Sequence, residues 1–332
     1  MNKGRRHLIP GTALAVAAAV GAGALTGCST GAAAGNTDKF DVVASFYPMA
    51  FLAERIGGSH VHVTSLTRPG QEPHDLEISV RQTARLEESD AVLYLKGLQP
   101  SVDETVAQSP VKTKIDASSL TTLEKHGVEA GGPADGHDSQ DGGHDVPEDH
   151  DGRRGGASDG RDPHVWLDPV RYAQIAEGVG RVFAKSDPEH AADYRKNTAA
   201  LVGQLRALNT RFAQGLAHTR TRVFVTTHAA FGYLAERYGL TQEAVSGLDP
   251  ESEPSAARVR DLQRTAKADG VTTVFYETLV SDDTARTVAA DAGLRTDVLD
   301  PLEGITDASR GRDYLQVMDA NLQALRTALG AR

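Results

Sequence analysis

The sequence predicts an α/β fold of two lobes, each a mainly parallel sheet with flanking helices, joined by a long helical region. Strand-like runs alternate with helical patterns between residues 40 and 118, and this alternation returns after residue 219. A long stretch of helical periodicity separates the two parts. Because ligands of open α/β sheets bind beyond the carboxyl ends of the strands, two such lobes facing each other would form a binding cleft.

The first lobe is expected to span residues 40–170. Its predicted strands alternate with its predicted helices in chain order. The strands are 40–46, 60–67, 91–96 and 111–118, and the helices are 48–58, 79–90 and 100–109. The strand at 60–67 alternates with period two, and the helix at 48–58 closes on glycine, as helices often do.

A polar tract interrupts this lobe, and we expect a disordered loop over residues 126–162. Its centre, "HDSQDGGHDVPEDHDG", has Val146 as its only large aliphatic residue. Such a segment cannot bury enough apolar surface to offset the entropy of ordering it. The loop carries four histidines, His126, His137, His144 and His150.

The linking helical region is expected over residues 171–218, with a break near Pro188, whose ring interrupts helical hydrogen bonding. Its second half carries one apolar stripe with three-and-four spacing, made of Tyr194, Leu201, Leu205, Leu208, Phe212 and Leu216. This stripe predicts a long helix with one buried face.

The second lobe is expected over residues 219–332. Its predicted strands are 221–227, 271–277 and 295–300, and its predicted helices are 229–239, 254–270, 281–293 and 309–329. The helix at 281–293 begins with a serine and ends on a glycine, which are the preferred residues at those ends.

The start of the chain reads as an export signal over residues 1–27, with a basic beginning and a short apolar run. It ends in "LTGC", which resembles a lipobox, so we expect Cys28 to be lipidated and residues 28–39 to form a flexible tether. The expected location is the outer face of the cell membrane. An ordinary signal peptide with an incidental cysteine is the alternative.

Cysteine content and charge exclude several functions. Cys28 is the only cysteine, so the mature chain has no internal disulfide and no thiolate metal ligand. The formal net charge is −10, and it becomes −13 without the three basic side chains of residues 1–27. Nucleic-acid binding needs a basic surface and is therefore not expected.

Four polar residues lie where predicted elements meet loops: His74, His164, His228 and Glu303. Imidazoles with one carboxylate suit Zn²⁺, which prefers four tetrahedral ligands. The spacing contains no HExxH motif, and any one of these residues taken alone reads more simply as a loop or capping residue.

Other polar or aromatic residues have simpler readings. Glu277 could orient a ligand histidine, although a solvated or capping carboxylate is the more common role. Trp166 is expected in the core and Asp168 at a helix start. His60 and His62 alternate on one predicted strand face and could pair on a metal, although surface or sheet-packing roles are the simpler reading. His190 and His218 lie in helical contexts with no partner pattern.

Five segments resemble the solute-binding lipoproteins of zinc and manganese ABC uptake systems. In chain order they are "FYPMAFLAERIGG", "PGQEPHDLEIS", "DPHVWLDP", "TTHAAFGYLAERYGL" and "LDPLEG". The resemblance covers residues 40–330. It implies two lobes that hold one metal ion between them, a rigid connecting helix, and the ligands His74, His164, His228 and Glu303. Some zinc members of the family lack a carboxylate at the last position, so a water as the fourth ligand is the alternative to Glu303.

The resemblance also implies a function. We expect a monomeric extracytoplasmic receptor, not an enzyme, that binds Zn²⁺ as its transported ligand and delivers it to an ABC permease. Manganese relatives commonly carry a carboxylate where this chain has His228, and a third imidazole favours zinc. The loop histidines are expected to form an accessory zinc collector, with a solubilising acidic linker as the alternative. Other functions left open are a manganese or iron receptor, an extracellular zinc-dependent hydrolase and a surface adhesion protein.

Overall fold

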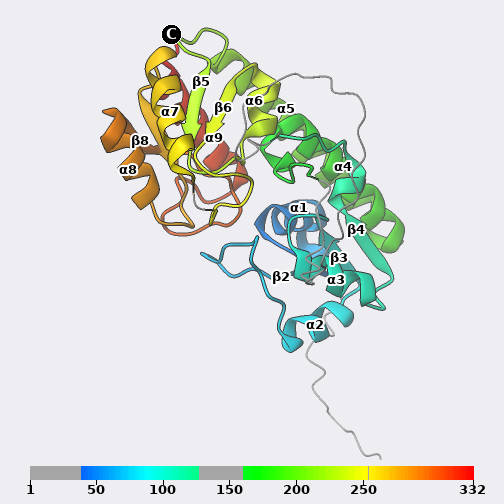
Figure 1. Ribbon diagram of the computed structural model, residues 1–332. Helices are drawn as coiled ribbons and strands as arrows, with labels where there is room; N and C mark the ends of the chain where they lie inside the picture. The colour runs from blue at the N-terminus through cyan, green and yellow to red at the C-terminus, as the bar shows by residue number, and fades with distance from the viewer. Residues whose placement is uncertain (1–38, 127–159, 253) are drawn as a thin grey trace, which may run out of the picture. The chain divides into compact units, whose positions relative to one another are not determined.

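The structure, a computed structural model, describes residues 39–126, 160–252 and 254–332, and it contains two four-stranded parallel sheets (Figure 1). The predictions for the signal peptide, Cys28, the tether and the loop histidines His137, His144 and His150 lie outside these described residues. Both predicted lobes are present, so the predicted fold class is confirmed.

The first sheet belongs to the amino-terminal lobe. Its strands are β1 (Phe40–Ala44), β2 (Val61–Ser65), β3 (Ala91–Tyr94) and β4 (Thr113–Asp116), in the spatial order β2-β1-β3-β4. The accompanying helices are α1 (Tyr47–Gly57), α2 (Val80–Glu87) and α3 (Pro100–Gln108). Helix α2 begins with a capping box, in which Ser79 and Gln82 satisfy each other's backbone N–H groups.

The second sheet belongs to the carboxyl-terminal lobe. Its strands are β5 (Val223–Thr226), β6 (Thr241–Ala244), β7 (Thr273–Tyr276) and β8 (Arg295–Val298), in the order β6-β5-β7-β8. Its helices are α6 (Gly232–Tyr238), α7 (Ala256–Ala268), α8 (Asp283–Ala292) and α9 (Tyr314–Leu329). The two lobes therefore share one strand order, although the sequence shows no short internal repeat.

Several elements of this lobe differ from the prediction. The predicted serine cap of the helix at 281–293 is wrong, because Asp282 precedes α8 and its side chain makes no capping hydrogen bond. Helix α6 begins at Gly232 instead of residue 229. Strand β6 was not predicted, because its sequence, TQEA, is polar and short and the strand lies at the sheet edge. Helix α9 begins at Tyr314 instead of residue 309, because the carboxylate of Asp313 caps it by accepting from the backbone N–H of Gln316.

Two packed helices form the predicted linking region. Helix α4 (Pro169–Ser186) is capped by Asp168, whose carboxylate accepts from the backbone N–H of Val170, as expected for the residue at a helix start. A short 3₁₀ turn, η4 (Pro188–His190), separates α4 from α5 (Ala191–Gly215). The predicted break at Pro188 is confirmed, and the stripe from Tyr194 to Phe212 is buried on α5.

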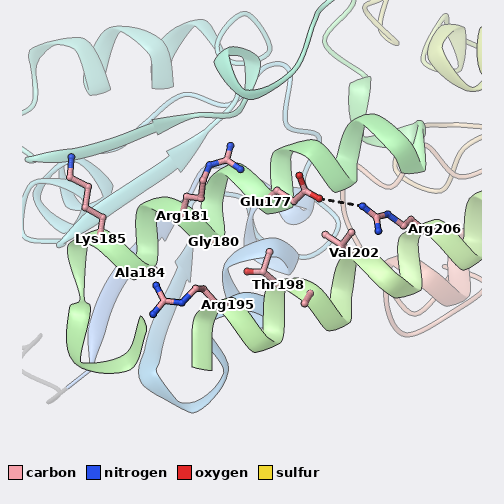
Figure 2. Close-up of a pocket in the computed structure, with 10 residues that line it drawn as sticks. Glu177, Gly180, Arg181, Ala184, Lys185, Arg195, Thr198, Val202 and Arg206 are labelled. Carbon is pink, nitrogen blue, oxygen red and sulfur yellow. Dashed lines mark ion pairs between the residues drawn. The ribbon is translucent and has the colours of Figure 1, made fainter. Parts of the chain in front are cut away.

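A groove of about 550 Å³ runs between α4 and α5 (Figure 2). At its floor the two helices approach closely, since a Cβ placed on Gly180 would lie 2.1 Å from Oγ1 of Thr198. None of the four candidate metal ligands lines this groove, so it is separate from the predicted binding cleft.

Aromatic side chains from both lobes meet in one hydrophobic core. The ring of Phe51 on α1 lies 5.4 Å from that of Tyr314 on α9, and the Tyr314 ring lies 4.6 Å from that of Tyr172 on α4. The buried Trp166 belongs to this core, as predicted. Within the described residues, no helix is both long and apolar enough to cross a bilayer.

Candidate metal site

The four candidate ligands from distant parts of the chain come together in the structure. One ligand atom each from His74, His164, His228 and Glu303 lies within 4.8 Å of the others. His164, His228 and Glu303 are fully or almost fully buried, and the His74 side chain keeps 13% of its surface exposed. Among the residues that the structure describes, this is the only such group with three or more potential ligands.

The three imidazoles converge on one carboxylate oxygen. The Nε2 atoms of His164, His74 and His228 lie 3.1, 3.3 and 3.6 Å from Oε1 of Glu303. In a tetrahedral zinc site with bonds of about 2.0–2.1 Å, neighbouring ligand atoms lie about 3.3 Å apart. The three distances from the imidazoles to Glu303 are therefore close to those of a tetrahedral site.

The ends of parallel strands place three of these residues. His74 lies in the loop after β2, His228 lies two residues after β5, and Glu303 lies in the loop after β8. The backbone carbonyl of His228 accepts from the side chains of Thr226 and Gln242, which fixes the start of its loop. The site thus lies where α/β sheets usually bind ligands.

The Glu303 loop has an unusual backbone. Leu302 has a φ of +62°, a left-handed conformation that is costly for a residue with a branched side chain. Two hydrogen bonds join the Asp300 backbone to the Asn321 side chain on α9, at 2.9 and 2.7 Å. The indole N–H of Trp166 donates to the carbonyl of Pro301 at 2.7 Å. These contacts hold Glu303 in place despite the strained neighbour.

His164 comes from the connection between the lobes. It caps the 3₁₀ turn η3 (Val165–Leu167), and its ring lies 5.3 Å from the ring of Trp166. The backbone N–H of His164 donates to Oδ1 of Asp162 at 2.9 Å. This contact fixes the direction of the ligand.

Two buried carboxylates hold the far nitrogens of the ligand rings. Nδ1 of His228 lies 2.7 Å from Oε1 of Glu277, and Nδ1 of His164 lies 2.7 Å from Oδ1 of Asp162. An ionised carboxylate can only accept, so each Nδ1 donates, and each Nε2 is directed at the site. The sequence suggested this role for Glu277 but missed Asp162, although it lies only two residues before His164.

The carboxylates change the protonation of the site. Burial alone would lower the pKa of His164 and His228, but Asp162 and Glu303 raise the first, and Glu277 and Glu303 raise the second. Burial would raise the pKa of Glu303, yet hydrogen bonds from His164 and His228 and the charge of His74 hold it well below its usual value. The buried carboxylates therefore favour the protonated forms of His164 and His228.

A further carboxylate, Glu72, lies beside the site and was not predicted. Burial, and then the negative charge of Glu303, raise the pKa of Glu72 to about 9. Its Oε1 accepts from the backbone N–H of His74 at 2.7 Å. Glu72 thus helps to hold the loop that carries the most exposed ligand.

The structure differs from the expectation for His126. This residue was predicted as a flexible loop ligand, but its side chain is only 19% exposed and its ring nitrogens lie 3.2 Å from Asp162 and 3.3 Å from Glu236. The neighbouring helix α6 supplies a glycine at the contact, which leaves space for the ring. His126 therefore lies on ordered backbone at the edge of the described chain.

The remaining histidines in the described part of the chain lie away from this site. His60 and His62 do not share a partner, since they contact Asp193 and Asp41 respectively. The ring of His60 instead stacks on that of His190, with centroids 4.0 Å apart. No local sequence pattern predicts this pair, because the two residues are 130 positions apart.

Comparison with known proteins identifies relatives of the whole described fold. A family model described as zinc-uptake complex component A, periplasmic, matches residues 42–328. The zinc-binding lipoprotein AdcA of Streptococcus pneumoniae is 35% identical over 294 residues, which are 87% of this chain and 55% of that protein. The chain thus spans about half the length of this relative.

A second curated relative matches over nearly its full length. The high-affinity zinc uptake system protein ZnuA of Bacillus subtilis is 31% identical over 305 residues, which are 90% of each chain. A solved structure of the Zn(II)-bound ZnuA-like domain of Streptococcus pneumoniae AdcA is 31% identical, with a TM-score of 0.69 over 88% of this chain and 99% of that one. The laminin-binding protein Lmb of Streptococcus agalactiae gives a TM-score of 0.73 at 28% identity, over 87% and 99% of the two chains.

Proposed function

The chain belongs to the family of the zinc-uptake complex component A, and from this we propose that it is a zinc receptor that captures Zn²⁺ for import. The ion would be the cargo of the protein, bound by His74, His164, His228 and Glu303. The observation that carries the proposal is the convergence of three Nε2 atoms on one oxygen of Glu303 at tetrahedral spacing.

The donor set supports zinc over harder ions. Three imidazoles and one carboxylate suit Zn²⁺, whereas Mn²⁺ favours oxygen-rich sites. Four protein donors also leave no position for the water that a catalytic zinc needs. Capture of the ion is therefore better supported than hydrolysis.

The proposed route of the ion follows from the family. Cys28 would carry lipid chains that hold the receptor, as a monomer, at the outer face of the cell membrane, and an ABC permease would receive the ion. The curated relatives are described as a zinc-binding lipoprotein and as a protein of a zinc uptake system, which supports both parts of this proposal.

A zinc titration against a competing chelator tests the proposed site. The protein would comprise residues 29–332, which include every described element, and a second form would lack residues 131–162. We expect one tight equivalent of zinc in both forms. If the tight equivalent disappeared with the deletion, the main site would lie in the tract and not in the cleft.

Ligand variants then locate the tight equivalent. His74→Ala should weaken it by more than the ~10–100-fold typical of residues outside the ligand sphere. His190→Ala provides the control, because His190 also contacts a carboxylate but lies on the turn between α4 and α5. Equal zinc affinity in the His74 and His190 variants would contradict the assignment. Manganese titrated in the same way should bind less tightly.

A further inference from the structure

His126 occupies a fitted position against helix α6. A Cβ placed on Gly232 would lie 2.3 Å from Cβ of His126 and 2.9 Å from Oδ2 of Asp162. The ring of Tyr233 meets the His126 ring edge-on at 4.4 Å. The imidazole therefore fits a space that exists only because residue 232 has no side chain.

Asp162 lies between two imidazoles. Its Oδ1 lies 2.7 Å from Nδ1 of His164, and its Oδ2 lies 3.2 Å from Nδ1 of His126. The carboxylate has no solvent exposure. Asp162 is thus a fully buried carboxyl group with one imidazole beside each oxygen.

Backbone contacts fix this arrangement to the carboxyl-terminal lobe. The N–H of Asp162 donates to the carbonyl of Glu124 at 2.9 Å, which joins the two chain segments that carry His126 and His164. The hydroxyl of Tyr233 accepts from the N–H of Glu124 and donates to the carbonyl of Asp162, both at 2.8 Å. A movement of either segment would therefore disturb the other.

We propose that His126 is a positioning residue for the metal site, acting on the ligand His164 through Asp162. This inference rests on the proposed function, because the affected property is zinc binding by His164. His126 would hold Oδ2 of Asp162 so that Oδ1 remains on Nδ1 of His164. The Nε2 atom of His164 then keeps its direction toward Glu303, at 3.1 Å.

The physical reason is the pairing of a fully buried carboxyl group. Without His126, Oδ2 of Asp162 would lose the imidazole that lies 3.2 Å away, and removing one partner of a buried pair is strongly disfavoured. The carboxyl group would then rotate, and its hydrogen bond to Nδ1 of His164 would weaken. Residues that hold a metal-ligating histidine typically change metal affinity by about 10–100-fold, and one contact further out we expect about tenfold.

The test compares two substitutions at the same position. His126→Phe keeps a ring but removes the nitrogen, and His126→Asn keeps an N–H group at the position of Nδ1, which faces Asp162. Zinc affinity and zinc dissociation rate are measured on the chain of residues 29–332. We expect His126→Phe to weaken binding about tenfold, mainly through faster dissociation, and His126→Asn to restore most of the affinity.

A second perturbation reaches the same contact from α6. Gly232→Ala would push a methyl group against His126 and Asp162 without changing any charge. Gly203→Ala is the matched control, because a Cβ there meets no atom within 4 Å. His190→Phe is the control for the histidine substitution. Nδ1 of His190 also faces a carboxylate, at 2.8 Å from Asp187, but His190 lies on the turn between α4 and α5. We expect weaker zinc binding in Gly232→Ala and unchanged binding in both controls.

Imidazole nitrogen NMR provides a readout that a purely structural role would not change. In the zinc-free protein, the Nδ1 signal of His164 should move in His126→Phe and return in His126→Asn. Unchanged affinity and unchanged His164 signals in His126→Phe would overturn the inference, whatever the change in melting temperature. Loss of weakly bound zinc alone, with the tight equivalent intact, would also overturn it. Failure of the unsubstituted protein to bind zinc would instead overturn the proposed function.

Discussion

Oε1 of Glu277 lies 2.7 Å from Nδ1 of His228, and both side chains are almost fully buried. The opposite nitrogen of the same ring faces Glu303 at 3.6 Å. Asp162 holds His164 in the same way, whereas no side-chain carboxylate holds the far nitrogen of His74 in the described residues. The rings of His164 and His228 are therefore held in fixed orientations, whereas His74 lies on a loop and its side chain is partly exposed.

Replacing Glu277 with Gln should weaken zinc binding by about 10–100-fold, because the ring of His228 loses its charged partner while the shape of the site is kept. Chelator competition would measure the change. Glu177→Gln is the control, since Glu177 lies on α4 and pairs with the exposed Arg206, 3.6 Å away. Equal affinities in the two variants would show that Glu277 does not orient His228.

Zinc affinity should rise with pH through the neutral range. The carboxylates around His164 and His228 raise the pKa of both imidazoles, so protons compete with zinc at a higher pH than they would at an unperturbed histidine. Titrations between about pH 5.5 and 8.5 would measure this dependence, since an ordinary histidine titrates near 6.5. A pH-independent affinity would contradict imidazole ligation.

The stability of the zinc-free protein should depend on pH in the opposite direction. His164 and His228 have raised pKa values in the folded state, so their stabilising contribution is fully present below the unfolded pKa of about 6.5 and is lost as pH rises through the folded values. Urea unfolding at several pH values would measure this. The zinc-induced increase in stability should therefore be larger at pH 8 than at pH 6.

The Glu303 loop should depend on Asn321. Asn321→Ala removes both hydrogen bonds to the Asp300 backbone and leaves buried polar groups unpaired, so the free energy of unfolding should fall by about 2–4 kcal/mol. Zinc affinity should fall as well, because Glu303 loses its support. Asn197→Ala is the control, since the side chain of Asn197 on α5 donates one hydrogen bond to the backbone carbonyl of Ile56 on α1. That variant should lose stability but keep its zinc affinity.

Two glycines in the helical pair should respond oppositely to alanine. Gly180→Ala should lower the free energy of unfolding by about 1–3 kcal/mol, because the new methyl group overlaps Thr198. Gly203→Ala should raise it by about 0.5–1 kcal/mol, since the position is exposed, helical and open. Thermal or urea unfolding would measure both changes. A stable Gly180→Ala protein would show that α4 and α5 can separate at little cost.

The sequence predicted most of the fold because strands and helices have local signals. Apolar runs and helix ends are visible within about ten residues, and the break at Pro188 follows from the chemistry of one ring. Strand β6 lacked such a signal, because its four residues are polar and its identity as a strand depends on pairing with β5. The identical strand order of the two lobes also became visible only in the structure.

The candidate site was only partly predictable for the same reason. The four proposed ligands came from motifs that resemble a known family, and the structure brings all four together. The contacts of Asp162 depend on three-dimensional proximity to both His126 and His164, which no local pattern reports. His126 was assigned to a flexible tract by composition, although its ring fits against Gly232 on a distant helix.

The aromatic contact between Phe51, Tyr172 and Tyr314 has a thermodynamic consequence. Because these rings belong to α1, α4 and α9, neither lobe can melt without exposing the apolar surface of the other. Calorimetry should therefore record a single cooperative transition, and bound zinc should shift that whole transition upward by mass action. An ion held between lobes that are so joined would leave through local opening of the His74 loop, without any hinge-like parting of the protein.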